Sequence, residues 1–178
     1  MTPLSSKSLI VNALTLSRVP LIFVYLVFAI LGNFSESYVY PLIAILAGMA
    51  AVGVPKDDEM VRAGINWLLA HQQPCGGWGE TLQSYEDVSL RGTGTVTPSQ
   101  TAWALLGLIG FGMADDPAVR AGIQWLAENQ QEDGGWEQTV FTGTGFPAVF
   151  YLRYHFYHQY FPLMAISKWL KIVRESNQ

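Results

Sequence analysis

The chain has 178 residues, of which half are hydrophobic and only 13% are charged, and its formal net charge is −4. This length suits one ordinary domain with an appendage. Ordinary domains carry about 25% charged residues, about twice the share found here, so protein or lipid must cover a large apolar surface of this chain. The acidic balance and the lack of any block of Lys and Arg exclude a nucleic-acid-binding protein.

The N-terminal part of the chain is strongly apolar. Residues 10–31 contain one charge, Arg18, and about 20 mainly apolar residues suffice for a helix to cross a bilayer, so we expect a membrane helix here. Lys7 and Arg18 lie towards its N-terminal side, which by the positive-inside tendency puts the N-terminus in the cytoplasm. A secretory signal and a buried hairpin are the alternatives, although no convincing small-residue cleavage site follows.

A second uncharged run covers residues 38–54, after a polar turn. Its many Ala and Gly residues suit close helix packing in lipid and in a protein core alike, so the pattern leaves both readings open. Residues 12–20, NALTLSRVP, resemble the opening membrane helix of the CDP-alcohol phosphatidyltransferases. That family's signature opens Asp-Gly and continues into Ala-Arg, whereas the only Asp-Gly pair here, at 133–134, continues into Gly135-Trp136. The resemblance therefore implies no phosphatidyltransferase activity.

A repeat with a period of 58 residues organises the rest of the chain. Residues 61–81 read VRAGINWLLAHQQPCGGWGET and residues 119–139 read VRAGIQWLAENQQEDGGWEQT, with 13 of 21 positions identical and no gap. The two segments are therefore copies of one structural unit.

Each copy predicts a helix followed by a turn. Acidic residues at 57–59 and 115–116 supply N-cap oxygens, and Pro117 suits the first helical position. An apolar stripe at helical spacing follows, and Gly-Gly at 76–77 and at 134–135 is expected to stop the helix. Another helix is expected after Pro98, with residues 45–53 as its counterpart before the first copy. Stacked helix pairs of this kind form an α-solenoid or an α/α toroid.

Gln72 and Trp78 bracket the first turn, as Gln130 and Trp136 bracket the second. A glutamine can donate its amide protons to the last carbonyls of a helix while its plane stacks on an indole. We therefore expect these four residues to tie helix end to loop, which is a structural role and not a catalytic one.

The two copies resemble the QW repeat of the triterpene cyclases. The pattern stands here as GINWL with Gln72 and GGW at 76–78, and as GIQWL with Gln130 and GGW at 134–136. With the intervening TPSQTAWAL and the tail, the resemblance to squalene-hopene cyclases spans roughly residues 48–170. It implies an all-α fold, a partial α/α toroid, and cyclisation of a polyene through carbocations in the hopanoid pathway, an isomerase chemistry.

The tail, TGTGFPAVFYLRYHFYHQYFPLMAISKWL from residue 142, is similar to the closing segment of the same family. The resemblance implies that five side chains line the substrate cavity: Phe146, Phe150, Leu152, Tyr154 and Tyr157. Aromatic faces suit that role because they stabilise a desolvated cation by about 2 kcal/mol or more without reacting with it. Phe146 and Phe150 would face cationic centres, and the two tyrosines would shape the wall. An aromatic stripe in the core or facing lipid is the alternative for the others.

The acid that would start the reaction is missing. The family resemblance implies an Asp-x-Asp-Asp motif, and none occurs. Protonating an alkene needs an acid far stronger than an ordinary Asp of pKa about 3.9, so we assign no catalytic residue to this chain. Neither the single Cys75 nor the pair His155 and His158, which could share a helix face, completes a metal site, so we expect no metal and no cofactor.

We therefore expect an apolar, membrane-inserted helical hairpin over residues 1–47 and a cyclase-like C-terminal lobe over residues 48–178. The protein would be membrane-associated with its N-terminus and lobe in the cytoplasm. It would be a triterpene-cyclase fragment, inactive alone, with an apolar polyene or triterpene ligand and a second chain supplying the missing toroid. The alternatives are a membrane-anchored helical-repeat module that binds an apolar lipid or a partner, and a fusion or truncation product without selected activity.

Overall fold

The structure is a computed structural model that describes residues 46–141, 145–146 and 150–176, without the side chains of Gly145, Phe146 and Phe150. All of these residues belong to one compact unit, Ser37–Gln178. The predicted hairpin over residues 1–47 lies outside the described residues, except for Leu46 and Ala47. Within the described part of the chain, no helix is both long and apolar enough to cross a membrane.

Helices dominate the described residues, which confirms the all-α prediction. Residues 46–51 are helical, and four longer helices follow: α3 (Glu59–Ala70), α4 (Pro98–Gly110), α5 (Pro117–Glu128) and α6 (Tyr157–Ser176). Two 3-10 turns, η1 (Leu82–Tyr85) and η2 (Val88–Leu90), lie in the long loop between α3 and α4. A minimal antiparallel ladder precedes α6, in which β1 (Gly145–Phe146) pairs with β2 (Phe150–Tyr151).

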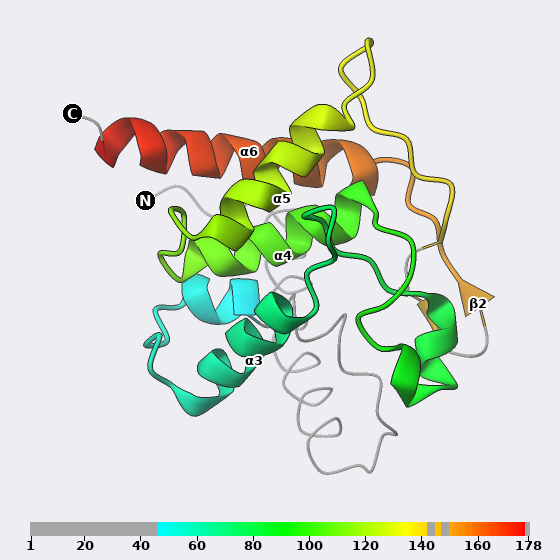
Figure 1. Ribbon diagram of the computed structural model, residues 1–178, viewed down its shortest axis with the longest axis horizontal. Coiled ribbons are helices and arrows are strands. Elements are labelled where there is room, and N and C mark those ends of the chain that lie inside the picture. The colour runs from blue at the N-terminus through cyan, green and yellow to red at the C-terminus, as the bar shows by residue number, and fades with distance from the viewer. Residues whose placement is uncertain (1–45, 142–144, 147–149, 177–178) are drawn as a thin grey trace, which may run out of the picture. The chain divides into compact units, whose positions relative to one another are not determined.

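The helices alternate between two kinds. Helix α4 lies at the centre of the unit and packs against both α5, which crosses in front of it, and α6, which runs beside it (Figure 1). The side chains of Ala102, Leu105 and Leu108 in α4 are 0% exposed. We call residues 46–51, α4 and α6 the inner helices, and we call the repeat helices α3 and α5 the outer helices, which bury one stripe each.

The helix starts agree with the sequence prediction. Asp58 accepts hydrogen bonds from the backbone N–H groups of Met60 and Val61, and Asp116 accepts one from Ala118. Pro117 occupies the first turn of α5, where its missing N–H costs nothing. The second aspartate of each acidic pair, Asp58 or Asp116, is therefore the helix cap.

The predicted helix ends were wrong. Helices α3 and α5 end at Ala70 and Glu128, before the Gly-Gly pairs are reached. His71 Nδ1 lies 2.7 Å from the Trp67 carbonyl, and Asn129 Nδ2 donates to the Trp125 carbonyl at 2.8 Å. Because each cap side chain bonds a carbonyl one turn back, it competes with continuation of the helix.

The glycine inside each outer helix admits a neighbouring side chain. A Cβ at Gly122 would lie 2.8 Å from Cζ3 of Trp78 and 2.9 Å from Cδ2 of Leu105, and one at Gly64 would lie 2.9 Å from Leu46. Glycine at these two positions therefore lets each outer helix pack closely against its neighbours. This packing outweighs the lower helix propensity of glycine relative to alanine.

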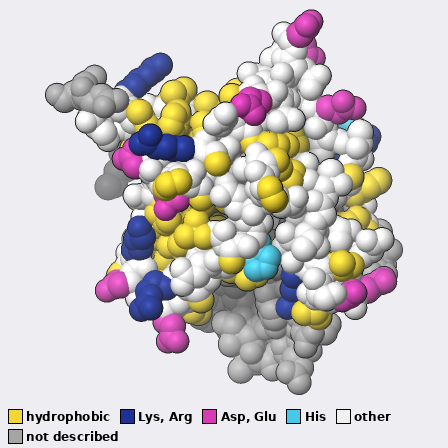
Figure 2. Space-filling view, viewed as in Figure 1, with side chains coloured by type: hydrophobic (Ala, Val, Ile, Leu, Met, Phe, Trp, Pro, Cys, Tyr) yellow, Lys and Arg dark blue, Asp and Glu magenta, His cyan; other side chains and the backbone are white. Residues whose placement is uncertain are grey.

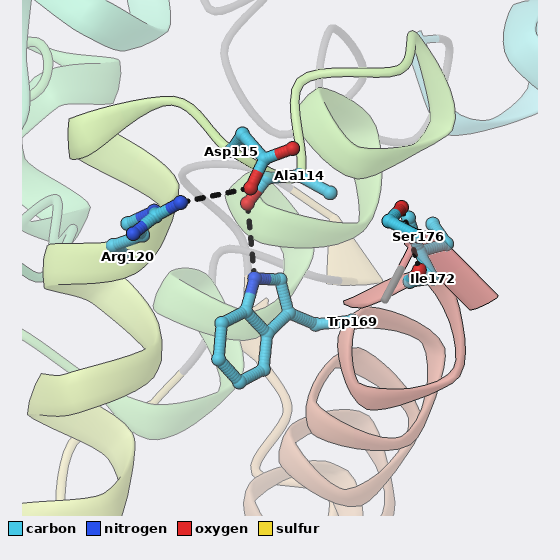
Figure 3. Close-up of polar contacts among 6 residues, drawn as sticks. All are labelled: Ala114, Asp115, Arg120, Trp169, Ile172 and Ser176. Atoms are coloured by element: carbon cyan, nitrogen blue, oxygen red, sulfur yellow. Dashed lines mark hydrogen bonds and ion pairs between the residues drawn. The ribbon is translucent and has the colours of Figure 1, made fainter. Parts of the chain in front are cut away.

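A hydrogen bond joins helix α6 to the turn between α4 and α5. Trp169 Nε1 donates to the carbonyl of Ala114 at 3.0 Å (Figure 3). The nearby ion pair of Arg120 with Asp115, at 2.8 Å, is exposed and contributes little to stability. Packing on α4 and the Trp169 bond therefore fix the place of α6.

Candidate functional site

The repeat tryptophans hold the outer helices to the turns that follow them. Trp78 is 3% exposed, and its indole Nε1 donates to the carbonyl of Leu68 at 2.8 Å. Trp136 is 2% exposed, and its Nε1 donates to Leu126 at 2.7 Å. Each bond satisfies a carbonyl in the last turn of an outer helix.

The repeat glutamines act differently from the prediction, because the indole takes the helix-end carbonyl. Gln72 Nε2 donates to the carbonyl of Gly76 at 2.6 Å and to that of Ala118, in α5, at 2.8 Å. Gln130 Nε2 donates to the carbonyl of Gly134 at 2.7 Å. Each glutamine thus closes its own turn, and Gln72 also joins the first repeat to the second.

The sequence did not predict a second set of hydrogen bonds, which a polar side chain makes with the backbone of each repeat tryptophan. Thr101 Oγ1 accepts from the backbone N–H of Trp78 and donates to its carbonyl, at 3.0 and 3.2 Å. Gln159 does the same for Trp136, at 3.2 and 2.9 Å. Both partners stand 23 residues after their tryptophan, so a polar side chain at that spacing was the signal available in the sequence.

Aromatic rings converge where α6 begins beside α4. Tyr154 and Tyr157 stack with centroids 4.4 Å apart and planes at 16°. Trp103 of α4 meets Tyr157 edge-on at 5.7 Å and Phe161 at 5.3 Å, and Tyr157 meets Phe161 at 5.1 Å. We call Trp103, Tyr154, Tyr157 and Phe161 the aromatic cluster.

The structure places the five residues predicted to line the substrate cavity in different surroundings. The structure brings Tyr154 and Tyr157 together, with Tyr154 40% exposed and Tyr157 half-buried. Leu152 is 37% exposed and is not among the stacked rings. The backbones of Phe146 and Phe150 are register partners in the β ladder, and their side chains lie outside the described residues. Their predicted roles at cationic centres remain predictions.

Two members of the aromatic cluster were missed. The pattern TPSQTAWAL predicts only a helix around Trp103, and Phe161 lies one turn after Tyr157 on α6. The spacing of Tyr157 and Phe161 was visible in the sequence as an i, i+4 pair. The contact with Trp103 depends on the packing of α4 against α6.

The ionisable groups at the cluster do not supply a strong acid. Burial, followed by the neighbouring Tyr160 and Tyr154, raises the pKa of the Tyr157 hydroxyl. Burial, followed by the charges of Arg153 and His155, lowers the pKa of His158. Both shifts favour the neutral side chain, so neither group is a strong acid.

The histidine pair and the buried carboxylate carry no catalytic arrangement. His155 lies in the turn before α6 and only His158 lies within the helix, so the expected shared helix face was wrong. Among the described residues no group of His, Cys, Asp and Glu could hold a metal ion. Glu80 is 7% exposed, and its carboxylate accepts hydrogen bonds from the Ser84 hydroxyl and the Gly92 N–H, so it is tied to the loop between α3 and α4.

Comparisons with known proteins point to one family. A family model described as the squalene-hopene cyclase C-terminal domain matches residues 29–171. The chain is 42% identical over 148 residues to a squalene–hopene cyclase of Zymomonas mobilis, covering 83% of this chain and 22% of that protein. It is 39% identical over 152 residues to a dammaradiene synthase of Dryopteris crassirhizoma, covering 78% of this chain and 22% of that protein. The chain thus spans about a fifth of the length of the curated relatives it matches.

Proposed function

The chain belongs to the squalene-hopene cyclase family, and on that premise we propose that it is a triterpene-cyclase lobe that contributes part of the wall around an apolar polyene. The observation that carries this proposal is the aromatic cluster, in which two stacked tyrosines meet Trp103 and Phe161. Aromatic faces stabilise cations through the ring quadrupole.

We expect no cyclisation by the chain alone. Its sequence contains no Asp-x-Asp-Asp, and the carboxylates of Asp58 and Asp116 accept backbone hydrogen bonds at helix starts. Both carboxylates are therefore engaged as helix caps. Incubating the purified chain with squalene and analysing the extract by gas chromatography tests this. Pentacyclic product above a heat-killed control would refute it.

Binding can be tested separately from the chemistry. A polyene that carries an ammonium group in place of a carbocation should bind the chain, because cation recognition by aromatic faces needs no acid. Tyr157→Leu should weaken binding about tenfold, which corresponds to about 1.4 kcal/mol, whereas Tyr157→Phe should retain it. Phe156→Leu, at a side chain that is 71% exposed, serves as the matched control. Equal affinity in Tyr157→Leu and the unmodified chain would exclude the cluster as the binding surface.

A membrane-anchored module that binds an apolar lipid is the second candidate. The observation that favours it is the pairing of an aromatic surface with a sequence that carries no proton donor of the family type. Membrane association itself is proposed from the uncharged runs in residues 10–31 and 38–54. Pelleting with membranes and resistance to carbonate extraction would support it, and recovery without detergent as a soluble monomer would contradict it.

A further inference from the structure

The loop between α3 and α4 contacts the tail of the chain through a pair of rings. Tyr85, at the end of the 3-10 turn η1, stacks on Tyr151 of β2 with centroids 5.8 Å apart and planes at 29°. Figure 1 shows this loop beside β2. In the sequence Tyr151 stands between Phe150 and Leu152, two of the residues predicted to line the cavity. The ring pair therefore connects a loop outside the aromatic cluster to the predicted cavity wall.

The β ladder that contains Tyr151 is very short. It pairs Gly145 with Tyr151 and Phe146 with Phe150, and each strand has two residues. Even a complete two-stranded hairpin is marginally stable at best in water. A contact from outside the ladder is therefore needed to keep this segment in one place, and the stack of Tyr85 on Tyr151 supplies such a contact.

A buried carboxylate holds the turn that carries Tyr85. Glu80 is 7% exposed and Ser84 is 1% exposed. The Ser84 hydroxyl donates to Oε1 of Glu80, and the backbone N–H of Gly92 donates to Oε2 at 2.9 Å. One carboxylate thus bonds both η1 and the residues after η2. Because a buried polar group that loses its partner costs free energy, these bonds oppose movement of Tyr85.

The base of the loop is joined to two helices. The backbone N–H of Glu80 donates to Oε1 of Gln100 in α4 at 2.6 Å, and Gln100 Nε2 donates to the Glu80 carbonyl at 3.3 Å. Gly92 lies against the end of α3, where its φ is +67° and a Cβ would overlap the ring of His71. The position of Tyr85 is therefore determined by contacts with the helical core.

The loop has a solvent side and a tail side. Residues 86–89, which follow Tyr85, are exposed. Figure 2 shows acidic and hydrophobic side chains at the surface towards the lower right, where this loop lies in Figure 1. Tyr85 and Tyr151 are both half-buried. The half-buried ring thus contacts the tail, while the residues next to it in the chain contact solvent.

We infer that Tyr85 is a positioning residue for the cavity wall and that Glu80 holds it in place. By stacking on Tyr151, Tyr85 fixes the course of residues 150–152, and it acts on a bound polyene through that segment without touching the ligand. The inference rests on the proposed function, because the wall has a ligand only if the chain binds a polyene.

The first test is binding of the ammonium-bearing polyene to the full chain. Tyr85→Leu should weaken binding about threefold to tenfold, the range that corresponds to one aromatic pair. Tyr85→Phe keeps the ring and should retain the affinity, and an equal loss in both variants would overturn the inference. Val88→Ala, in the same loop at a side chain 47% exposed, is the matched control and should bind like the unmodified chain. Affinities are compared where circular dichroism shows every variant folded, because a residue that only stabilises the fold changes the melting temperature and not the affinity of the folded chain.

A double-mutant cycle tests whether Tyr85 acts through Tyr151. Tyr151→Leu should also weaken binding, and adding Tyr85→Leu to it should cause little further loss, because both substitutions remove the same contact. Additive losses would overturn the inference. Ser84→Ala removes one of the two hydrogen bonds to the Glu80 carboxylate and should cause a smaller loss than Tyr85→Leu.

A second measurement needs no ligand. The methyl groups of Leu152 would be labelled with carbon-13 in the full chain and observed by NMR. Tyr85→Leu should shift these signals and Val88→Ala should not; unchanged Leu152 signals in Tyr85→Leu would overturn the inference whether or not a polyene binds. Shifted signals in a chain that binds no polyene would support the positioning contact and count only against the proposed function.

Discussion

Replacing Trp78 with alanine should destabilise the protein by about 3–5 kcal/mol, the usual loss when a large buried side chain is truncated. The indole is 3% exposed and packs against the position of Gly122 in α5. Its Nε1–H donates to Leu68, and this hydrogen bond accounts for about 1 kcal/mol of the loss. The backbone of Trp78 stays clamped by Thr101, so the substitution removes the ring without freeing the turn.

Two further variants divide this loss into its parts. Trp78→Phe keeps most of the ring and removes the donor, so we expect a loss of about 1–2 kcal/mol. Phe156→Ala, at a side chain 71% exposed, should change the free energy of unfolding by less than about 0.5 kcal/mol. Urea denaturation followed by far-UV circular dichroism measures all three without relying on tryptophan fluorescence. A loss below about 1 kcal/mol for Trp78→Ala would refute the account of the repeat as an indole packed between two helices.

Three other predictions test the repeat and its charges. Gly122→Ala should lower stability by about 1–3 kcal/mol despite the helix propensity of alanine, because its Cβ would overlap Trp78 and Leu105; a raised melting temperature would contradict this. Gln72→Ala should cost about 1 kcal/mol more than Gln130→Ala, because only Gln72 also bonds Ala118; equal losses in urea denaturation would refute the asymmetry. Burial, Arg153 and His155 lower the pKa of His158, so the unfolded chain binds more protons and stability falls as the pH drops below about 6.5. His158→Gln should show a smaller acid-induced loss of melting temperature, and an unchanged pH profile would contradict the shift.

Much of the fold was determined by local sequence. Asp58, Asp116 and Pro117 mark helix starts through chemistry that needs no distant partner, and they were predicted correctly. The 58-residue repeat gave the helix pairs, because an apolar stripe at helical spacing must bury itself against another element. The family followed from the same residues, since Gln72, Trp78 and their second copies stand at fixed spacing.

Tertiary structure decided which group bonds which. The sequence could not show that the indole of Trp78 takes the Leu68 carbonyl and leaves Gln72 to bond Ala118, because both side chains are capable donors. Nor could it show that Trp103 joins Tyr157, since that contact depends on how α4 packs against α6. The helix ends were misread because His71 and Asn129 bond carbonyls one turn back, before the glycines are reached.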